Sequence, residues 1–145
     1  MLTVRAIDKI ETVEKESNRI SGCMIPLWKD YDDMIPMHPR FVYAMTCAPQ
    51  STKGPYLHTK RRGLLTLIEG SAVIVYQEGK EFHTIALHAM DSVAMLDIPA
   101  GIGHLIYNSS FDKSALFVNI CDYPWRKDDN ETLTPDFSGW RMHVS

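Results

Sequence analysis

Two histidines lie in sequence contexts that suit proton transfer. His104 belongs to the string PAGIGHLIYN, residues 99–108, in which Pro99 and Gly101 are typical of a turn between two strands. Side chains alternate along a strand, so His104 is expected to point into the interior of a domain built from sheets. Asn108 is expected to close the next turn. An imidazole exchanges a proton near neutral pH, and we interpret His104 as a pocket residue.

The second histidine, His58, is followed by a cationic run. The segment GPYLHTKRRG carries Lys60, Arg61 and Arg62 directly after it. Under strict alternation, Tyr56 and Lys60 face the same side of a strand as His58. Two interpretations of the cations stay open: a substrate-binding cluster, or a solvated loop, because basic clusters on loops are common.

The elements that must position these residues are strands. Segments rich in β-branched and aromatic residues are short, and no segment keeps a long amphipathic helical period with caps. The expected strands are Val4–Ile10, Arg19–Leu27, Phe41–Cys47, Tyr56–Thr59, Leu64–Glu69, Ser71–Gln77, Glu81–Leu87, Ser92–Ile98, His104–Asn108 and Ala115–Cys121. Glu78-Gly79-Lys80 reads as a hairpin turn. Many short strands predict an all-β sandwich or barrel.

Length and composition indicate one globular domain. The chain has 145 residues, 45% of them hydrophobic and 23% charged, and a formal net charge of −3. Without a basic excess, a nucleic-acid partner is not expected. No apolar run has the length of a signal-peptide core or of a membrane span, so we expect no membrane partner and a cytoplasmic location. An odd number of dispersed cysteines suits reduced thiols.

The string of residues 99–108 resembles the second sequence motif of the cupin β-barrels, which implies a jelly-roll fold in a single domain. The first cupin motif supplies His-x-His and a Glu as metal ligands, but here Lys60 replaces the second His, and Gly63 or Leu64 replaces the Glu. A cation repels a divalent ion, so a metal would need His83 or His88 in addition. We therefore expect no metal, with a metal-dependent cupin enzyme such as a dioxygenase as an alternative.

A narrower resemblance covers about residues 54–140. The segments around His58 and His104, the strand ALFVNICDY of residues 115–123 and the tail ending near Trp140 resemble the dTDP-4-dehydrorhamnose 3,5-epimerases and the nucleotide-sugar 3,4-ketoisomerases. The resemblance implies an isomerase or epimerase of deoxysugar or cell-surface polysaccharide biosynthesis, acting on a nucleotide-linked 4-keto-6-deoxy sugar. It implies no cofactor, and His58 as the base that removes a proton next to the carbonyl.

The resemblance also implies roles for the neighbouring residues. A cation near the developing enolate lowers the barrier, which implies Lys60 there, whereas Arg61 or Arg62 would meet the nucleotide diphosphate. The phenolic acid of the epimerases falls on Val118. The acid is then expected among four tyrosines: Tyr107, Tyr123, Tyr76 and Tyr56. Alternatively, one base performs both transfers. The expected substrate contacts are Tyr56, Lys60, Arg61, Arg62, His104 and Asn108.

In the epimerases a carboxylate beyond the position of Trp140 orients the base, but this sequence has only five residues after Trp140. Asp97 or Glu69 is expected to take that role.

We divide the chain into N-terminal strands within residues 1–50, a barrel core at 54–123 and a wrapping tail at 124–145. The loop of residues 30–40 is expected to act as an arm exchanged between subunits, because strand exchange would supply a second wall of the site. The resemblance implies a homodimer. The alternative from another functional class is a cupin that binds a sugar nucleotide or another small ligand without turnover.

Overall fold

The computed structural model describes residues 1–29 and 37–140, which form twelve strands and no α-helix. The strands are β1 (Thr3–Ile7), β2 (Ile10–Val13), β3 (Ile20–Met24), β4 (Phe41–Cys47), β5 (Ser51–His58), β6 (Gly63–Glu69), β7 (Ser71–Glu78), β8 (Glu81–His88), β9 (Val93–Ile98), β10 (Gly103–Asn108), β11 (Ala115–Cys121) and β12 (Thr132–Leu133). Within this described part, no helix is long and apolar enough to span a membrane. The all-β prediction is confirmed.

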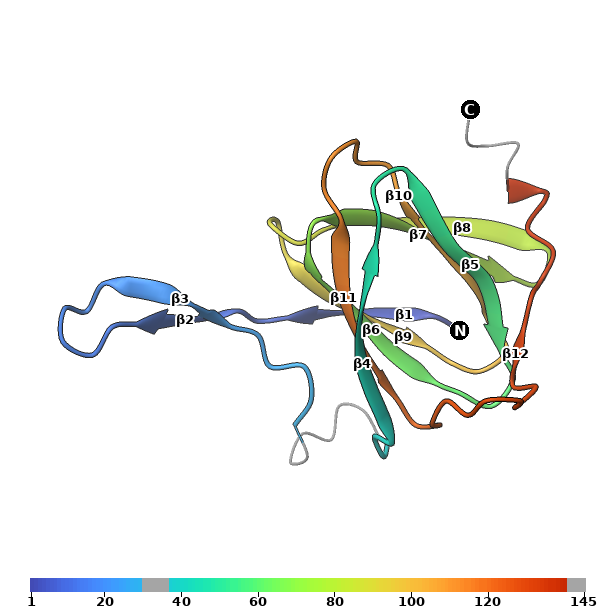
Figure 1. Ribbon diagram of the computed structural model, residues 1–145, viewed down its shortest axis with the longest axis horizontal. Helices are drawn as coiled ribbons and strands as arrows, with labels where there is room; N and C mark the ends of the chain where they lie inside the picture. The colour runs from blue at the N-terminus through green and yellow to red at the C-terminus, as the bar shows by residue number, and fades with distance from the viewer. Residues whose placement is uncertain (30–36, 141–145) are drawn as a thin grey trace.

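Ten of these strands form two antiparallel sheets that face each other (Figure 1). One sheet has the order β1-β9-β6-β11-β4 and the other the order β12-β5-β10-β7-β8. Buried side chains of both sheets, among them Leu96, Phe117, Ile74 and Ile106, meet in one core between them. This is the jelly-roll arrangement that the sequence predicted. The expected hairpin turn is also present, since β7 and β8 pair as far as Glu78 and Glu81.

The turn between β9 and β10 holds the two histidine-bearing strands together. Gly101 has a φ of 88°, a left-handed conformation that glycine adopts without strain. Its N–H donates a hydrogen bond of 2.7 Å to the carbonyl oxygen of His58. Beyond the turn, β10 pairs with β5 so that His104 lies opposite Tyr56. The turn therefore fixes the end of β5 next to the start of β10.

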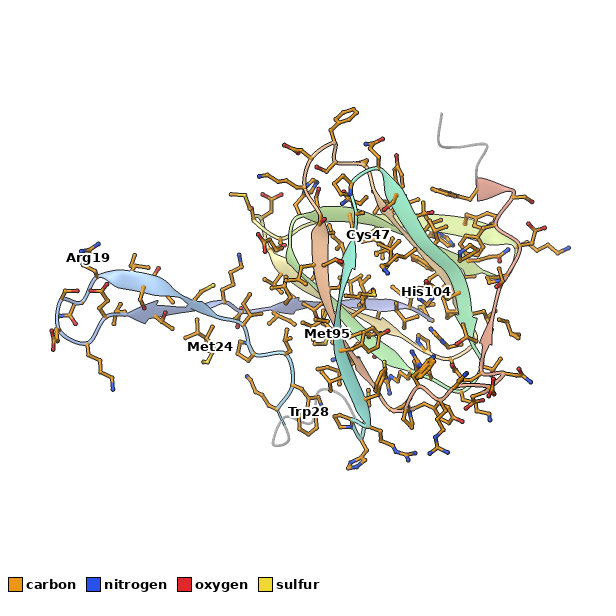
Figure 2. The ribbon with its side chains drawn as sticks, in the orientation of Figure 1. Arg19, Met24, Trp28, Cys47, Met95 and His104 are labelled. Carbon is orange, nitrogen blue, oxygen red and sulfur yellow. The ribbon has the colours of Figure 1, made fainter. Side chains whose placement is uncertain are left out.

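The N-terminal region differs from the sequence prediction. Residues 4–10 do not form one strand, because β1 pairs with β9 of the barrel whereas β2 leaves the sheet and pairs with β3. The β2–β3 hairpin projects away from the barrel (Figure 1), with Arg19 and Met24 on it (Figure 2). Of the loop expected at 30–40, residues 30–36 lie outside the described residues.

The C-terminal tail contains a strand that the sequence did not predict. Residues 132–133 form β12, which pairs with β5 so that Thr132 lies opposite His58. Farther on, Phe137 and Trp140 pack against Leu105 on the face of β10 that points away from the other sheet. The tail thereby brings its residues 131 and 132 to the end of β5.

Candidate active site

A cavity of about 390 Å³ opens between the two sheets. One wall comes from β5 and β10 and carries Tyr56, His58 and His104. The opposite wall comes from β4, β6 and β11 and carries Tyr43, Gly63 and Asn119. Figure 2 shows His104 among the side chains that fill the space between the sheets. Both predicted imidazoles therefore line the same cavity.

His58 is held by the C-terminal tail. Its Nδ1 lies 3.1 Å from Glu131 Oε2 and 3.1 Å from the hydroxyl of Thr132, which itself donates to Glu131 Oε2 over 2.9 Å. A carboxylate only accepts hydrogen bonds, so Nδ1 carries the hydrogen of the neutral ring. The lone pair is then on Nε2. This is the arrangement that an imidazole base requires, with a carboxylate fixing its tautomer.

The ionisation of this pair follows from its surroundings. Burial lowers the pKa of His58 below its usual value, and the nearby charge of Arg61 lowers it further, although Glu131 acts in the opposite direction. Burial raises the pKa of Glu131, but the hydrogen bonds and charge of His58, the Thr132 hydroxyl and the Arg61 N–H together outweigh burial and lower it. At neutral pH the pair is a carboxylate and a neutral imidazole.

His104 is more deeply buried, with 7% of its surface exposed. Its Nδ1 donates to the backbone oxygen of Ile102 over 3.2 Å, because a carbonyl can only accept. Burial, the largest cause, lowers the pKa of His104 to about 4, and the neighbouring His58 lowers it as well. His104 is therefore neutral at physiological pH, with its lone pair on Nε2.

Tyr56 completes a group of three rings. Its centroid lies 6.2 Å from that of His58 and 6.1 Å from that of His104, and the two imidazole centroids are 5.8 Å apart. A phenol and two neutral imidazoles thus face a common space. Such a group can remove a proton from carbon and deliver another to oxygen without moving the backbone.

The three cations that follow His58 have three different environments. Arg61 is 6% exposed, lines the cavity and lies over the ring of Phe41. Lys60 is exposed, outside the cavity wall, with its ammonium 5.5 Å from the ring of Tyr123. Arg62 forms a two-pronged ion pair with Asp97 at 2.6 and 2.8 Å. Of the predicted cluster, the structure brings only Arg61 to the imidazoles.

Three other predicted site residues lie away from the cavity. Tyr107 packs edge-on against Trp140 on the outer face of β10. The hydroxyl of Tyr123 donates to Asp129 in the tail over 2.7 Å. Asn108 is fully buried and bonds the backbone of Cys47, Ser110 and Lys113, so it closes a turn as the sequence suggested but turns no atom toward the cavity. The geometry gives none of these three side chains access to a substrate between the imidazoles.

The sequence assigned the carboxylate that orients His58 to Asp97 or Glu69, and the structure places neither of them at the imidazole. Asp97 is engaged with Arg62, and Glu69 is an exposed residue at the end of β6. Glu131 lies there instead. Only 3% of its surface is exposed, and its carboxylate also accepts a hydrogen bond from the backbone N–H of Arg61. Glu131 follows polar turn residues, so the sequence around it has no periodic signal. It reaches the site because β12, which begins at the next residue, pairs with β5.

The described part of the chain can be searched for a set of side chains that would bind a metal ion. No group of three or more His, Cys, Asp or Glu side chains converges there in a way that could hold a metal ion. His83 lies on β8 against Tyr76 and near Glu81, away from His58 and His104. Among the residues that the structure describes, the two cavity imidazoles therefore belong to no such group of three.

A family model described as "FdtA: WxcM-like, C-terminal" matches residues 6–137. The chain belongs to this family. A comparison with curated protein sequences found no match. The family match spans the barrel, both histidine-bearing strands and the part of the tail that contacts His58.

Several solved structures share the fold of this member of the WxcM-like family. A dTDP sugar isomerase from Desulfovibrio desulfuricans G20 superposes with a TM-score of 0.78 at 17% identity, covering 94% of this chain and 85% of its own. A histidine-to-asparagine mutant of the 3,4-ketoisomerase QdtA from Thermoanaerobacterium thermosaccharolyticum, in complex with TDP-4-keto-6-deoxyglucose, gives 0.72 at 17% identity, with 99% and 91% covered. A 3,4-ketoisomerase from Helicobacter canadensis gives 0.71 at 19%, with 99% and 98% covered.

Proposed function

We propose that this chain is a cytoplasmic sugar-nucleotide 3,4-ketoisomerase acting on a TDP-linked 4-keto-6-deoxy sugar. The observation that carries the proposal is the group of Tyr56, His58 and His104 around one cavity, with Glu131 fixing the tautomer of His58. The names of the fold neighbours, among them a ketoisomerase crystallised with TDP-4-keto-6-deoxyglucose, support the choice of substrate class.

The proposed reaction moves a carbonyl by one carbon. Nε2 of His58 removes the proton from C3, and the released electron pair forms a C3–C4 double bond while the C4 carbonyl oxygen becomes negative. Protonation of that oxygen gives an enediol. Loss of the proton from the C3 hydroxyl then forms the C3 carbonyl, and His58 returns its proton to C4. Nothing is oxidised or reduced overall, so the reaction consumes no cofactor.

Tyr56 is the acid in this proposal. Its ring is adjacent to both imidazoles, and among the four tyrosines considered from the sequence it is the one that lines the cavity. A phenol that gives its proton to O4 can take one back from O3, because the two oxygens are on neighbouring carbons. One base and one phenol are then sufficient for both transfers.

In this proposal Trp125 contacts the nucleotide part of the substrate. Its side chain lines the cavity yet is 62% exposed, on the tail segment that precedes Glu131. An exposed indole at the opening offers a flat apolar surface on which a pyrimidine ring can stack. We propose that the thymine ring rests there while the sugar lies between the imidazoles.

The test is incubation with TDP-4-keto-6-deoxyglucose in heavy water. The expected result is a 3-keto isomer detected by NMR, with deuterium at C4 of the isomer and at C3 of recovered substrate. His58→Asn is expected to reduce kcat by about 10²–10⁴-fold, the usual contribution of an acid–base group. His83→Asn makes the same change at a half-exposed ring on β8 and should leave the rate unchanged.

A wild-type protein that binds the sugar nucleotide but yields no isomer and no deuterium would overturn the catalytic proposal in favour of a binding protein. Binding would be followed by calorimetry on the same preparation. A metal-dependent reaction would appear instead as activity that a chelator removes and an added divalent ion restores.

We also propose that the chain forms a homodimer through the β2–β3 hairpin. The hairpin projects from the barrel (Figure 1). Its exposed apolar side chains are Ile10, Val13, Ile20 and Met24. A two-stranded hairpin is marginally stable alone, and exposed apolar side chains on it favour burial against a second copy. Light scattering should give twice the mass of the chain, and Ile20→Asp should halve it. A monomeric wild type at micromolar concentration would contradict the proposal.

A further inference from the structure

Arg61 is a buried cation that interacts with Tyr43 and Cys121 but keeps one unpaired N–H donor. Its side chain is 6% exposed, and Nε has no hydrogen-bond partner among the residues that the structure describes. Glu131 is the carboxylate near it, at 4.0 Å between Nε and Oε2, which is beyond hydrogen-bond length. Glu131 is instead committed to His58, Thr132 and backbone N–H groups. A buried guanidinium with an unpaired donor is costly unless a ligand completes it.

The opposite wall holds a second incomplete polar group. Asn119 donates from Nδ2 to the hydroxyl of Tyr43 over 2.8 Å, but its Oδ1 is buried without a partner in the described residues. Asn119 lines the cavity and is 9% exposed. Buried polar atoms in proteins are almost always paired, so an orphaned acceptor facing a cavity indicates a missing donor.

Gly63 keeps space for this amide. A Cβ added at Gly63 would lie 3.0 Å from Asn119 Oδ1, closer than side-chain carbons normally approach. The backbone of Gly63 does not require glycine for its conformation, since its φ is not in the left-handed range. The absence of a side chain at Gly63 therefore leaves room next to Asn119 Oδ1. Two independent features, an unpaired acceptor and the glycine beside it, mark the same spot.

The position of Arg61 fits a role at the reacting atoms. It lines the cavity with His58, and its charge acts on two cavity side chains: burial and then Arg61 lower the pKa of His58, whereas burial raises the pKa of Tyr43 and Arg61 opposes that rise. Lys60, the cation that alternation placed beside His58, is outside the cavity wall. A fixed cation in a water-poor site stabilises negative charge on oxygen far more than it does in water.

We propose that Arg61 binds the C4 carbonyl oxygen of the sugar and stabilises its negative charge in the enediolate, while Asn119 Oδ1 accepts a hydrogen bond from a neighbouring sugar hydroxyl. This inference rests on the proposed function and extends it. It assigns Arg61 to the sugar and not to the diphosphate. Arg61 lies over Phe41 of β4 and Asn119 is on β11, so both groups are on the side of the cavity opposite to the imidazoles, and the sugar ring would lie between the two sides.

Binding experiments test the assignment without turnover. In a His58→Asn background, the affinity for TDP-4-keto-6-deoxyglucose and for TDP alone is measured by calorimetry, with and without Arg61→Met. The expected result is a ten- to hundredfold weaker binding of the sugar nucleotide, about the value of a hydrogen bond to a charged group, with TDP unchanged. Lys80→Met, a cation removed from the exposed β7–β8 turn, should change neither affinity.

Turnover provides the second measurement. With an intact His58, Arg61→Met is expected to lower kcat on the order of 10²–10³-fold, the loss typical of one removed oxyanion donor, and added guanidine should restore part of it. Asn119→Leu is expected to weaken sugar-nucleotide binding without affecting TDP. Melting curves of each variant verify folding, and Arg61→Gln replaces Arg61→Met if the latter unfolds.

The outcomes separate this inference from the proposed function. Equal weakening of TDP and the sugar nucleotide would place Arg61 on the diphosphate and overturn the assignment, as would affinities and kcat unchanged by Arg61→Met. Either result leaves the ketoisomerase proposal standing if the wild type makes the isomer. A wild type that binds neither ligand overturns both.

Discussion

The two segments that supply the imidazoles follow different rules. In β10 the sides alternate as a strand requires, with His104 and Ile106 facing the cavity and Tyr107 on the outer face. In residues 59–62, just beyond β5, alternation from His58 fails, because the consecutive residues Thr59 and Lys60 are both exposed and Arg61 is buried in the cavity wall.

The difference shows what sets side-chain direction in each segment. A residue of β10 is fixed by ladder hydrogen bonds to β5 and β7, whose geometry is the same for any sequence. In residues 60–62 the backbone N–H groups bond side-chain carboxylates instead, those of Glu131 and Asp122. Direction in the turn therefore depends on acidic residues 60 or more positions away.

The largest expected effect concerns the strand side of this comparison. The unfolded chain protonates His104 near pH 6.5, and the folded protein only near pH 4, so the unfolded state binds more protons between these values. Folding stability should therefore fall by about 3 kcal/mol as the pH drops from about 6.5 to 4.

His104→Gln, which cannot titrate, should remove that part of the pH dependence. Denaturant unfolding of both proteins across this range measures it, and the difference between them cancels the contributions of His58 and the carboxylates. Parallel curves for the wild type and the variant would show that His104 is not buried in its neutral form.

On the turn side, Glu131→Gln should reduce kcat by about 10²-fold, because an amide can hold the wrong tautomer of His58. Glu131 raises the pKa of His58, so its loss should move the acid limb of kcat/KM to lower pH. Glu81→Gln, the same change beside half-exposed His83, is the control and should alter neither quantity. An unshifted acid limb would remove Glu131 from the proposed role.

Gly101 joins the two segments, and Gly101→Ala should cost about 1 kcal/mol of folding stability because alanine is strained at a φ of 88°. Gly79→Ala, at a φ of 63° in the β7–β8 turn, should cost about the same. Neither added methyl meets another atom within 4 Å. Only Gly101→Ala should reduce kcat. Relief of the backbone strain at residue 101 would shift its N–H, which donates to the carbonyl oxygen of His58. Equal activities would show that this hydrogen bond does not position the base.

The smallest effect is expected on the outer face of β10. Tyr107→Phe keeps the ring that packs on Trp140 and should leave kcat unchanged and stability within about 0.5 kcal/mol, as for most surface changes. Tyr56→Phe on the cavity side should lower kcat strongly. A loss of activity in Tyr107→Phe would return the proton donor to the position that the sequence allowed and that the structure places outside.

The barrel strands were predictable because their signal is local. Alternating or continuous apolar runs between turn residues placed β6 through β11 within a residue or two of their observed ends. The predicted strand Val4–Ile10 covered most of β1 but only the first residue of β2, because the change of partner from β9 to β3 leaves no local signal in the sequence. Strand β12 was missed because two residues in a polar tail carry no period.

The sequence by itself determined the all-β fold, the turn at Gly101 and the inward direction of His104, because each follows from turn chemistry or from alternation within a strand. Only the tertiary structure decided that Glu131 contacts His58, that Arg61 and not Lys60 lines the cavity, and that Tyr56, of the four tyrosines named from the sequence, lies beside the imidazoles. These outcomes depend on contacts between distant segments, which local patterns do not encode.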